Sequence, residues 1–354
     1  MTTAPKTPRR ALVLGGGGVL GFSWMVGALS ALESVAEFDA REVQVAVGTS
    51  AGSVVAALLG CRLPVEVIAR HHQGVPDIGD PVLRYDYASD SGDALPPRPG
   101  WRPASPRLAL DGLRHPRRIS PLVALSGLLP AGRGSLRAVG DMVAGVADEA
   151  GFGGTWPDRP RPWVVAADYR TGRRIVFGRD DLALAPDGTQ RIVRRADLAD
   201  AVRASCSIPG WYPPTTIGGV PYIDGGAVSN ASVDVLRDTA VDEVYVFAPM
   251  ASLEPDHPRT TLARLERRVR RAVTKRIVSD AAVLRANGAR VCVVTPGAAD
   301  LEAMGVNLMN PAHRNDVYES ARVSAAIQLR RQLAATQGWG RRSAVGRSNP
   351  TGSA

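Results

Sequence analysis

Four consecutive glycines at residues 15–18 separate an apolar run from a helical pattern near the start of the chain. An ordered glycine loses more backbone entropy than any other residue, so this run indicates that another group must approach bare backbone there. The apolar residues 11–14 predict a buried strand, and residues 22–38 predict a helix. Residues 43–47 and 51–59 repeat this order around a second tight turn. Two such units in succession predict a parallel sheet covered by helices.

The remaining chain favours one large α/β domain over residues 9–335, with a three-layer α/β/α architecture and a mainly parallel central sheet. Residues 76–160 are rich in Pro, Gly and Arg, which is typical of a variable, lid-like insertion. Residues 1–8 are expected to be flexible, and residues 336–354 to form a disordered tail.

Composition excludes several classes of protein. The chain has 354 residues, of which 45% are hydrophobic, and we expect neither a signal peptide nor an apolar run long enough to span a bilayer. Its three cysteines are scattered, as expected for a reduced cytoplasmic chain without disulfides or a metal site. The net charge of +9 comes almost entirely from arginine across the whole chain. It therefore does not indicate nucleic-acid binding.

The second turn, GTSAG, matches G-x-S-x-G between a strand and a helix. This is the context of a nucleophile elbow, with Ser50 on a sharp turn and small residues, Gly48 and Gly52, on either side. The hydroxyl would lie at the N-terminal end of a helix, where developing negative charge is favoured. The alternative is a glycine-flanked turn with a serine that simply faces solvent.

A serine nucleophile requires a base, and the histidines are poor candidates. None of the five, at positions 71, 72, 115, 257 and 313, follows a convincing strand. Asp224 is a better candidate because it directly follows a short apolar strand and precedes Gly225 and Gly226. Asp-Gly is also a common turn dipeptide, so this segment alone carries little information. An ordinary Asp has a pKa near 3.9 and is a weak base, so we expect burial to raise it.

The glycine-rich loop has two interpretations. Gly16, Gly18 and Gly21 fit the dinucleotide-binding pattern G-x-G-x-x-G, but the acidic residue expected after a second strand is missing. An oxyanion hole fits better, because successive backbone N–H groups can stabilise the oxyanion of an acyl-transfer intermediate. The predicted loop residues are Gly16, Gly17, Gly18 and Gly21.

The ordered blocks GGGGVLG, GTSAG and DGG resemble the patatin-like phospholipase family. Two softer matches are AVRASCSIPGWYPP and Asn230, and the resemblance spans about residues 9–335. It implies a Ser50–Asp224 dyad without histidine, which hydrolyses phospholipids or other lipid esters through an acyl-enzyme and needs no metal or cofactor. The family often has a basic residue where this chain has Leu20, which weakens any preference for anionic head groups.

Two segments relate to substrate access. Residues 259–276 place basic residues among apolar ones, which indicates either a helix that rests on an anionic membrane or, preferably, a surface helix with its apolar stripe on the core. Trp101 and Trp156 of the insertion are candidates to line an acyl channel. A soluble esterase or thioesterase acting on small esters, and a catalytically silent lipid-binding protein, remain alternative functions.

Overall fold

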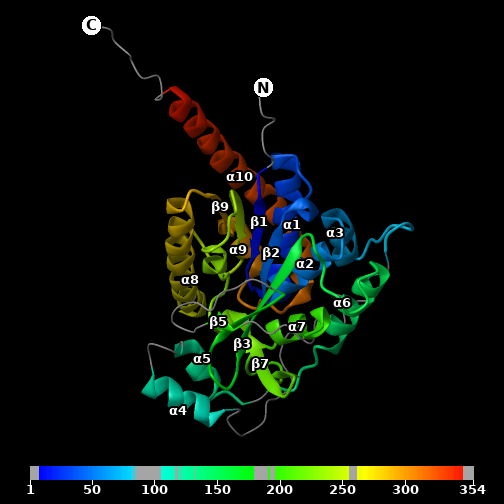
Figure 1. The fold of residues 1–354 in the computed structure, drawn as a ribbon, viewed down its shortest axis with the longest axis vertical. Helices are drawn as coiled ribbons and strands as arrows, with labels where there is room; N and C mark the ends of the chain where they lie inside the picture. Colours follow the sequence, from blue (N-terminus) through cyan, green and yellow to red (C-terminus); the bar gives the residue numbers. More distant parts are fainter. Residues whose placement is uncertain are drawn as a thin grey trace.

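The computed structural model describes residues 8–81, 83, 105–115, 119, 121–130, 132–178, 190–191, 196–254 and 261–345. Within them the chain forms a nine-stranded sheet with the order β5-β4-β3-β2-β1-β8-β9, and β7 and β6 continue from β3 (Figure 1). The strands are β1 (Arg10–Leu14), β2 (Val45–Thr49), β3 (Arg161–Asp168), β4 (Arg174–Phe177), β5 (Gln190–Arg191), β6 (Thr215–Ile217), β7 (Val220–Asp224), β8 (Glu243–Phe247) and β9 (Arg290–Val294).

The centre of the sheet is parallel, as the strand–turn–helix repeats predict. β1 pairs in parallel with β2 and β8, β2 with β3, and β8 with β9. All five residues of β2 and of β8 are buried, which is the pattern of strands covered on both faces. The mainly parallel α/β/α architecture is therefore confirmed.

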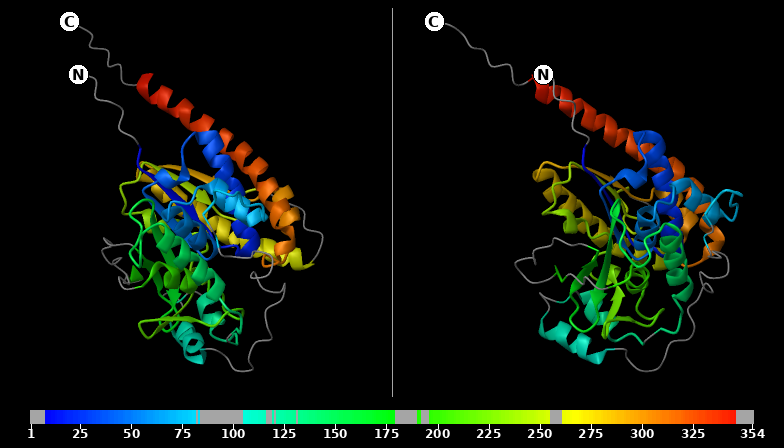
Figure 2. Two further views of the ribbon diagram at one scale, coloured as in Figure 1. Left: turned by 90° about the vertical axis from the view of Figure 1, so that its right-hand side faces the viewer. Right: turned by 45° about the vertical axis from the view of Figure 1, so that its right-hand side comes forward.

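Helices cover both faces of this sheet (Figures 1 and 2). The α-helices are α1 (Gly18–Ala36), α2 (Ala51–Gly60), α3 (Val65–Gln73), α4 (Pro106–Arg114), α5 (Pro121–Ser126), α6 (Arg137–Glu149), α7 (Leu198–Ser205), α8 (Thr261–Ala286), α9 (Ala298–Met304) and α10 (Arg314–Val345). Short 3₁₀ helices are η1 (Ala40–Glu42), η2 (Gly225–Ala227), η3 (Val233–Leu236) and η4 (Pro311–His313).

Alternation along the strands divides the core into two layers. Leu12 and Leu14 of β1 belong to the layer that includes α1, α2, α3 and α10, whereas Ala11 and Val13 belong to the layer beneath α8. Ile277 of α8 is buried in that second layer. Val273 also packs against this layer, as the preferred interpretation of residues 259–276 expects of an apolar stripe on the core, whereas Val269 is 46% exposed.

α1 corrects one expectation from the sequence. With 19 residues and a mean hydropathy of 1.5, it is long and apolar enough to cross a bilayer by length and composition alone. However, 67% of this segment is buried inside the fold, where α10 packs along it (Figure 2). Its apolar character is that of a core helix between the sheet and α10.

One expected boundary also differs. α10 continues to Val345, so the boundary expected at residue 336 falls within a helix. Its early turns pack on α1, and this docking extends regular structure beyond the apolar pattern in the sequence. The insertion at 76–160 contributes α4, α5 and α6, while Trp101 and residues 1–7 and 346–354 lie outside the described residues.

The register along β3 determines which loops meet. β2 runs parallel to the first part of β3 and ends where Thr49 pairs with Val165. β7 then continues beside β3 in the antiparallel direction and ends where Asp224 pairs with Ala166. Two strands therefore approach the same point from opposite directions and pair with consecutive residues of β3. Position 50 and position 224 must lie side by side as a result.

An ion pair connects the sheet to the segment after β7. Arg174 of β4 makes a bidentate pair with Asp234 of η3, at 2.7 and 2.8 Å, and the two side chains are only 6% and 14% exposed. Removal of one partner would leave the other charge buried and uncompensated.

We expect Arg174→Met to lower the free energy of unfolding by about 3–5 kcal/mol, because Asp234 loses its only charge-matched bidentate donor in the described structure. Arg174→Met combined with Asp234→Leu should recover most of this loss. Urea denaturation measures both, and Arg322→Met, which breaks an exposed pair with Glu319, serves as the control with a cost below about 1 kcal/mol. A double variant no more stable than Arg174→Met would contradict this assignment.

Candidate active site

Ser50 lies on a strained turn between β2 and α2. Its φ of 53° and ψ of −126° are costly for a residue with a side chain, and the surrounding close contacts hold it there. A Cβ on Gly48 would meet the backbone of Gly52, and one on Gly52 would meet the carbonyl groups of residues 14 and 15. Only glycine fits at both positions. The Ser50 hydroxyl thus stands at the N-terminus of α2 with the residue 5% exposed.

Ser205, at the end of α7, anchors the turn from behind. The Ser50 N–H donates to Ser205 Oγ at 2.8 Å, and Ser205 Oγ donates to the Val165 carbonyl at 2.6 Å. The serine turn is therefore tied to β3 through a buried hydroxyl. The sequence did not indicate this role for Ser205, although the residue lies within the AVRASCS segment that matched the family.

Asp224 is buried at the end of β7 and interacts with Ser50. Its N–H donates to the Ser207 carbonyl at 3.0 Å, and its Oδ1 accepts the Gly226 N–H at 2.7 Å. Burial raises the pKa of Asp224 to about 6, against the opposing effect of side-chain hydrogen bonding with Ser50 and of the Gly226 N–H. Gly225 packs against the Val165 carbonyl, where a Cβ would collide. The structure brings Ser50 and Asp224 together.

The glycine-rich loop lies against this pair, but its members differ in what they offer. The N–H groups of Gly16 and Gly21 donate to the carbonyls of Asn230 and Gly17, at 3.0 and 2.9 Å. Among the described residues, no acceptor takes the N–H of Gly17 or Gly18. The prediction that all four glycines belong to an oxyanion hole is therefore corrected: the N–H groups of Gly16 and Gly21 are already hydrogen-bonded within the protein. Gly16 instead provides close approach, because a Cβ there would lie 3.2 Å from Ser50 Cβ.

Distant segments hold the loop in place. Pro249, after β8, packs against the loop, and the position of a Cβ on Gly17 would lie 2.9 Å from its ring. The buried Leu20 donates its N–H to the Leu308 carbonyl at 2.9 Å, so the position that departs from the family pattern supports the loop through its backbone. The segment that follows Asp224, residues 225–230, is called the acid loop. The Asn230 side chain lies between the glycine-rich loop and this acid loop, within 3.9 Å of the place of a Cβ on Gly226.

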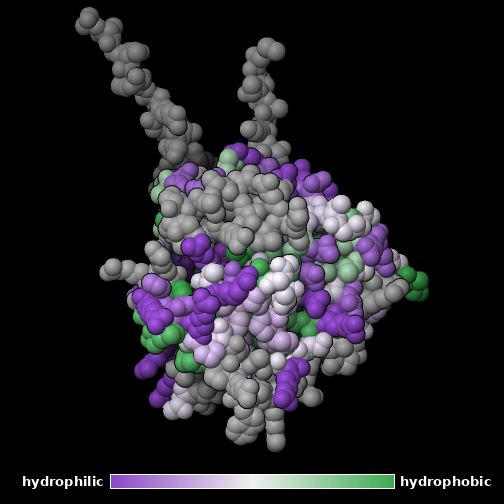
Figure 3. All heavy atoms as spheres, turned by 60° about the horizontal axis from the view of Figure 1, so that its bottom comes forward, coloured by the Kyte–Doolittle hydropathy of each residue, from purple (hydrophilic) through white to green (hydrophobic). Residues whose placement is uncertain are grey.

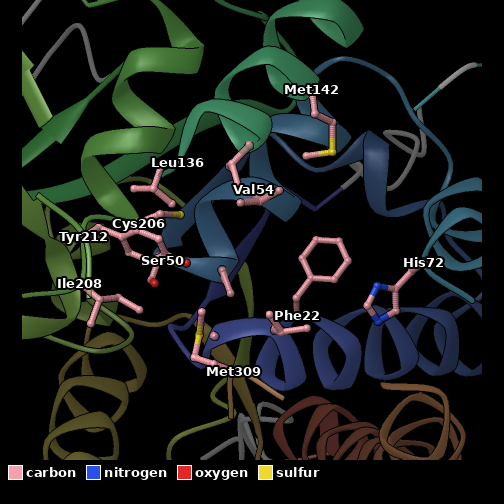
Figure 4. A pocket seen from close by; sticks show the side chains of 14 residues that line it. Phe22, Ser50, Val54, His72, Leu136, Met142, Cys206, Ile208, Tyr212 and Met309 are labelled. Atoms are coloured by element: carbon pink, nitrogen blue, oxygen red, sulfur yellow. The ribbon is translucent and has the colours of Figure 1, made fainter. Parts of the chain in front are cut away.

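An apolar pocket extends from Ser50 (Figure 4). Its walls come from α1, α2, α6, the segment after α7 and the loop before η4; they include Phe22, Val54, Leu136, Met142, Ile208, Tyr212 and Met309. The insertion thus supplies part of the wall through α6 and the residue before it. Sequence reasoning missed these residues because apolar side chains far apart in the chain carry no signal of their common cavity.

Trp156 does not line this pocket, contrary to the expectation from the sequence. Its indole Nε1 donates to the Ala196 carbonyl at 2.8 Å, and the ring packs beside Gly178. A buried indole N–H needs a hydrogen-bond acceptor, and the Ala196 carbonyl provides one. Trp156 therefore lies between the end of β4 and the start of α7.

Among the described histidines, only His72 lines the pocket of Ser50, and His71 beside it in α3 does not. His72 lines the pocket at the end opposite Ser50, where its Nε2 makes a 2.6 Å hydrogen bond with Ser23 Oγ (Figure 4). Burial, aided by the charge of Arg314, lowers the pKa of His72 to about 3. His115 and His313 are exposed, and His257 lies outside the described residues.

The described part of the chain contains no set of side chains that could bind a metal ion. No group of three or more His, Cys, Asp or Glu side chains there has the arrangement to hold a metal ion. Cys61, Cys206 and Cys292 are buried free thiols. Burial raises the pKa of the Cys206 thiol, which lines the pocket, so this thiol stays protonated.

Comparison with known proteins identifies the family of this chain. Residues 12–237 match the family described as patatin-like phospholipase, and the match covers more than half of the chain. The chain therefore belongs to the patatin-like phospholipase family. Among solved structures, VipD from Legionella pneumophila is similar with a TM-score of 0.38 and 12% sequence identity, over 93% of this chain and 71% of that chain.

The raised pKa of Asp224 has a consequence for stability. The pKa is about 6 in the folded chain against 3.8 for an ordinary Asp, so the folded state favours the protonated acid. This contribution is fully present below about pH 4 and is lost as the pH rises through 6. The Asn side chain mimics the protonated acid at every pH.

We therefore expect Asp224→Asn to be more stable than the wild type at pH 8, by up to roughly 3 kcal/mol, with the difference vanishing near pH 4. Urea denaturation at pH 4, 6 and 8 measures this difference. Asp141→Asn on the exposed side of α6 is the control and should leave the pH dependence unchanged. Equal pH dependence of Asp224→Asn and the wild type would show that the acid is not strained by burial.

Proposed function

We propose that this protein is a serine hydrolase of lipid acyl esters, with Ser50 as nucleophile and Asp224 as base. Membership of the patatin-like phospholipase family supports lipid acyl hydrolysis in general. The observation that carries the specific assignment is the contact between the Ser50 hydroxyl and a buried carboxyl whose pKa is raised to about 6. A carboxylate with this pKa is ionised at neutral pH and is a stronger base than an ordinary Asp.

The proposed reaction has two balanced steps. Asp224 accepts the proton of the Ser50 hydroxyl as the oxygen attacks the ester carbonyl, and the tetrahedral intermediate expels the alcohol, which takes that proton. Water then attacks the carbonyl carbon of the acyl-enzyme and gives one proton to Asp224. The second tetrahedral intermediate breaks its bond to Ser50 Oγ, which takes that proton from Asp224, and the fatty acid is released. Ser50 and Asp224 return to their initial states.

The oxyanion of each intermediate would be stabilised by the N–H groups of Gly17 and Gly18. These are the loop donors without an acceptor in the described structure, and the N-terminus of α2 adds its partial positive charge. Each such donor typically contributes about 3–4 kcal/mol to the barrier reduction. Gly16 and Gly21 contribute by letting the loop approach Ser50 and Pro249.

The pocket favours an acyl chain over a small substrate. Its lining beyond Ser50 is mainly aliphatic, aromatic and thioether side chains, and each buried CH₂ of a ligand gains about 0.8 kcal/mol. A small ester would leave most of this apolar wall unused. The soluble-esterase alternative therefore predicts no gain from longer acyl chains, whereas the lipid hydrolase predicts a large one.

We expect Ser50→Ala and Asp224→Asn each to reduce kcat/KM for an acyl ester by about 10³-fold or more, since each removes one member of a unit that acts together. In the wild type, kcat/KM should fall as the pH drops through about 6, because Asp224 must be ionised to accept the proton. Initial rates with a p-nitrophenyl ester between pH 4.5 and 8.5 test both effects.

Ser30→Ala, which removes a hydroxyl from α1 outside the pocket, is the matched control and should retain full activity. A fluorophosphonate probe should label the wild type and Ser30→Ala but not Ser50→Ala. If wild-type Ser50 stays unlabelled, the chain is a silent lipid-binding protein. If Asp224→Asn retains most of its activity, the base is another group.

We expect Val54→Trp to shorten the accepted acyl chain. Val54 lies one helical turn beyond Ser50 and lines the pocket, so an indole there should exclude about four methylenes. That loss is roughly 3 kcal/mol, or on the order of 100-fold in kcat/KM for a decanoyl ester, with little change for an acetyl ester. Val278→Trp on the exposed face of α8 is the control, and an unchanged decanoyl-to-acetyl ratio would place the acyl chain elsewhere.

A further inference from the structure

Two helices of the insertion, α4 and α5, pack against each other and expose large apolar side chains. In α4, Leu108, Ala109 and Gly112 face the core, while Leu110 and Leu113 are 46% and 81% exposed. The end of α5 and the turn after it add three more, Leu125, Leu128 and Leu129, which are 56%, 53% and 43% exposed. These five leucines form what we call the α4–α5 face. Single exposed leucines are ordinary, but five within twenty residues are a patch.

Arginines border the same patch. Arg107 and Arg114 of α4 are 90% and 63% exposed and are spaced by helical turns from Leu110 and Leu113. Both reach Asp111 only at 3.8 and 3.9 Å, so their charge stays available to solvent. Among the described residues from 105 to 137 there are four arginines and one aspartate. Figure 3 shows this end of the molecule, with apolar and strongly hydrophilic side chains intermixed.

The α4–α5 face adjoins a segment that lines the pocket. Leu129 lies beside Gly210, where a Cβ would be 3.7 Å from its Cδ1, and Gly134 N–H donates to the Trp211 carbonyl at 3.0 Å. The neighbouring Ile208 and Tyr212 line the pocket itself. The turn after α5 therefore contacts the segment 208–212, which in turn lines the pocket of Ser50.

The face is also supported by the acid loop. Beneath α4 and α5, Leu108 and Val123 form a small core with Ile223 of β7, and Ala227 and Val228 of the acid loop pack against it. The patch thus stands on the segment that carries Asp224, at the end of the molecule opposite the C-terminal end of α10 (Figure 1).

We propose that the α4–α5 face docks on a lipid bilayer that contains anionic lipids and presents the pocket entrance to it. Exposed leucines insert among acyl chains and the bordering arginines pair with lipid phosphates, which is the chemistry of interfacial helices. This inference rests on the proposed lipid-ester hydrolysis for its purpose. α8 fits less well, because its outer face is basic and offers only Val269 and Val278 as exposed large apolar side chains among those described.

Co-sedimentation with vesicles tests the proposal directly. The Ser50→Ala protein, which cannot degrade the lipid, is mixed with vesicles of phosphatidylglycerol and phosphatidylcholine in equal amounts. Adding Leu110→Ser with Leu113→Ser, or Arg107→Gln with Arg114→Gln, should reduce the partition coefficient at least about tenfold, because each pair removes one of the two attractions. All four side chains are exposed, so the variants should fold.

Two matched controls locate the effect. Val323→Ser with Ile327→Ser removes exposed apolar side chains from α10, and Arg268→Gln with Arg271→Gln removes exposed charges from α8. Both should bind within about twofold of the parent. Undiminished binding of the α4 variants, or a tenfold loss for the α8 variant, overturns the proposal. So does a parent protein that does not bind vesicles but dimerises through Leu110 and Leu113.

The outcomes separate docking from catalysis. With Ser50 intact, the α4 variants should hydrolyse a soluble p-nitrophenyl butyrate at the wild-type rate and lose activity only on vesicles. Vesicle binding without any ester hydrolysis would support docking and reject the proposed function. Hydrolysis of vesicle lipid that is unaffected by the α4 substitutions would support the proposed function and reject docking by this face.

Discussion

The pairing of β3 with two strands that run in opposite directions is the constraint on which the site depends. Thr49 of β2 pairs with Val165, and Asp224 of β7 pairs with Ala166, so the two loops end against consecutive residues of one strand. The Val165 carbonyl also accepts the Ser205 hydroxyl and contacts the Gly225 backbone. Because backbone pairing sets these positions, the serine and the acid meet without help from flexible side chains.

This arrangement lowers the stability of the fold at two positions. Ser50 occupies a positive φ, and Asp224 is held in a buried site that opposes its ionisation. The Ser205 hydroxyl and the tight glycine contacts offset the first cost by leaving the turn no alternative. Strain and desolvation thus fall on two neighbouring residues of an otherwise well-packed sheet, which is the pattern that the proposed catalytic roles of Ser50 and Asp224 would require.

The sequence predicted the parts of the structure whose causes are local. The strands and helices around the first two turns follow from apolar periodicity. The sharp turn at Ser50 follows from the spacing of Gly48, Ser50 and Gly52. It did not predict what depends on register. That the Gly16 N–H is satisfied by Asn230, or that Leu136 and Met309 share a pocket, follows from contacts between segments far apart in the chain. Such contacts leave no periodic trace in a single sequence.

The α4 helix of the insertion carries apolar side chains on both its buried and its exposed surface. α4 buries Leu108 against the acid-loop core and turns Leu110 and Leu113 outward, although a short helix needs only one apolar face to fold. The outward leucines add nothing to packing within the described fold and expose apolar area to water. An environment that covers them would stabilise the insertion where it forms the wall of the pocket. Substrate access and the order of that wall would then depend on the same contact.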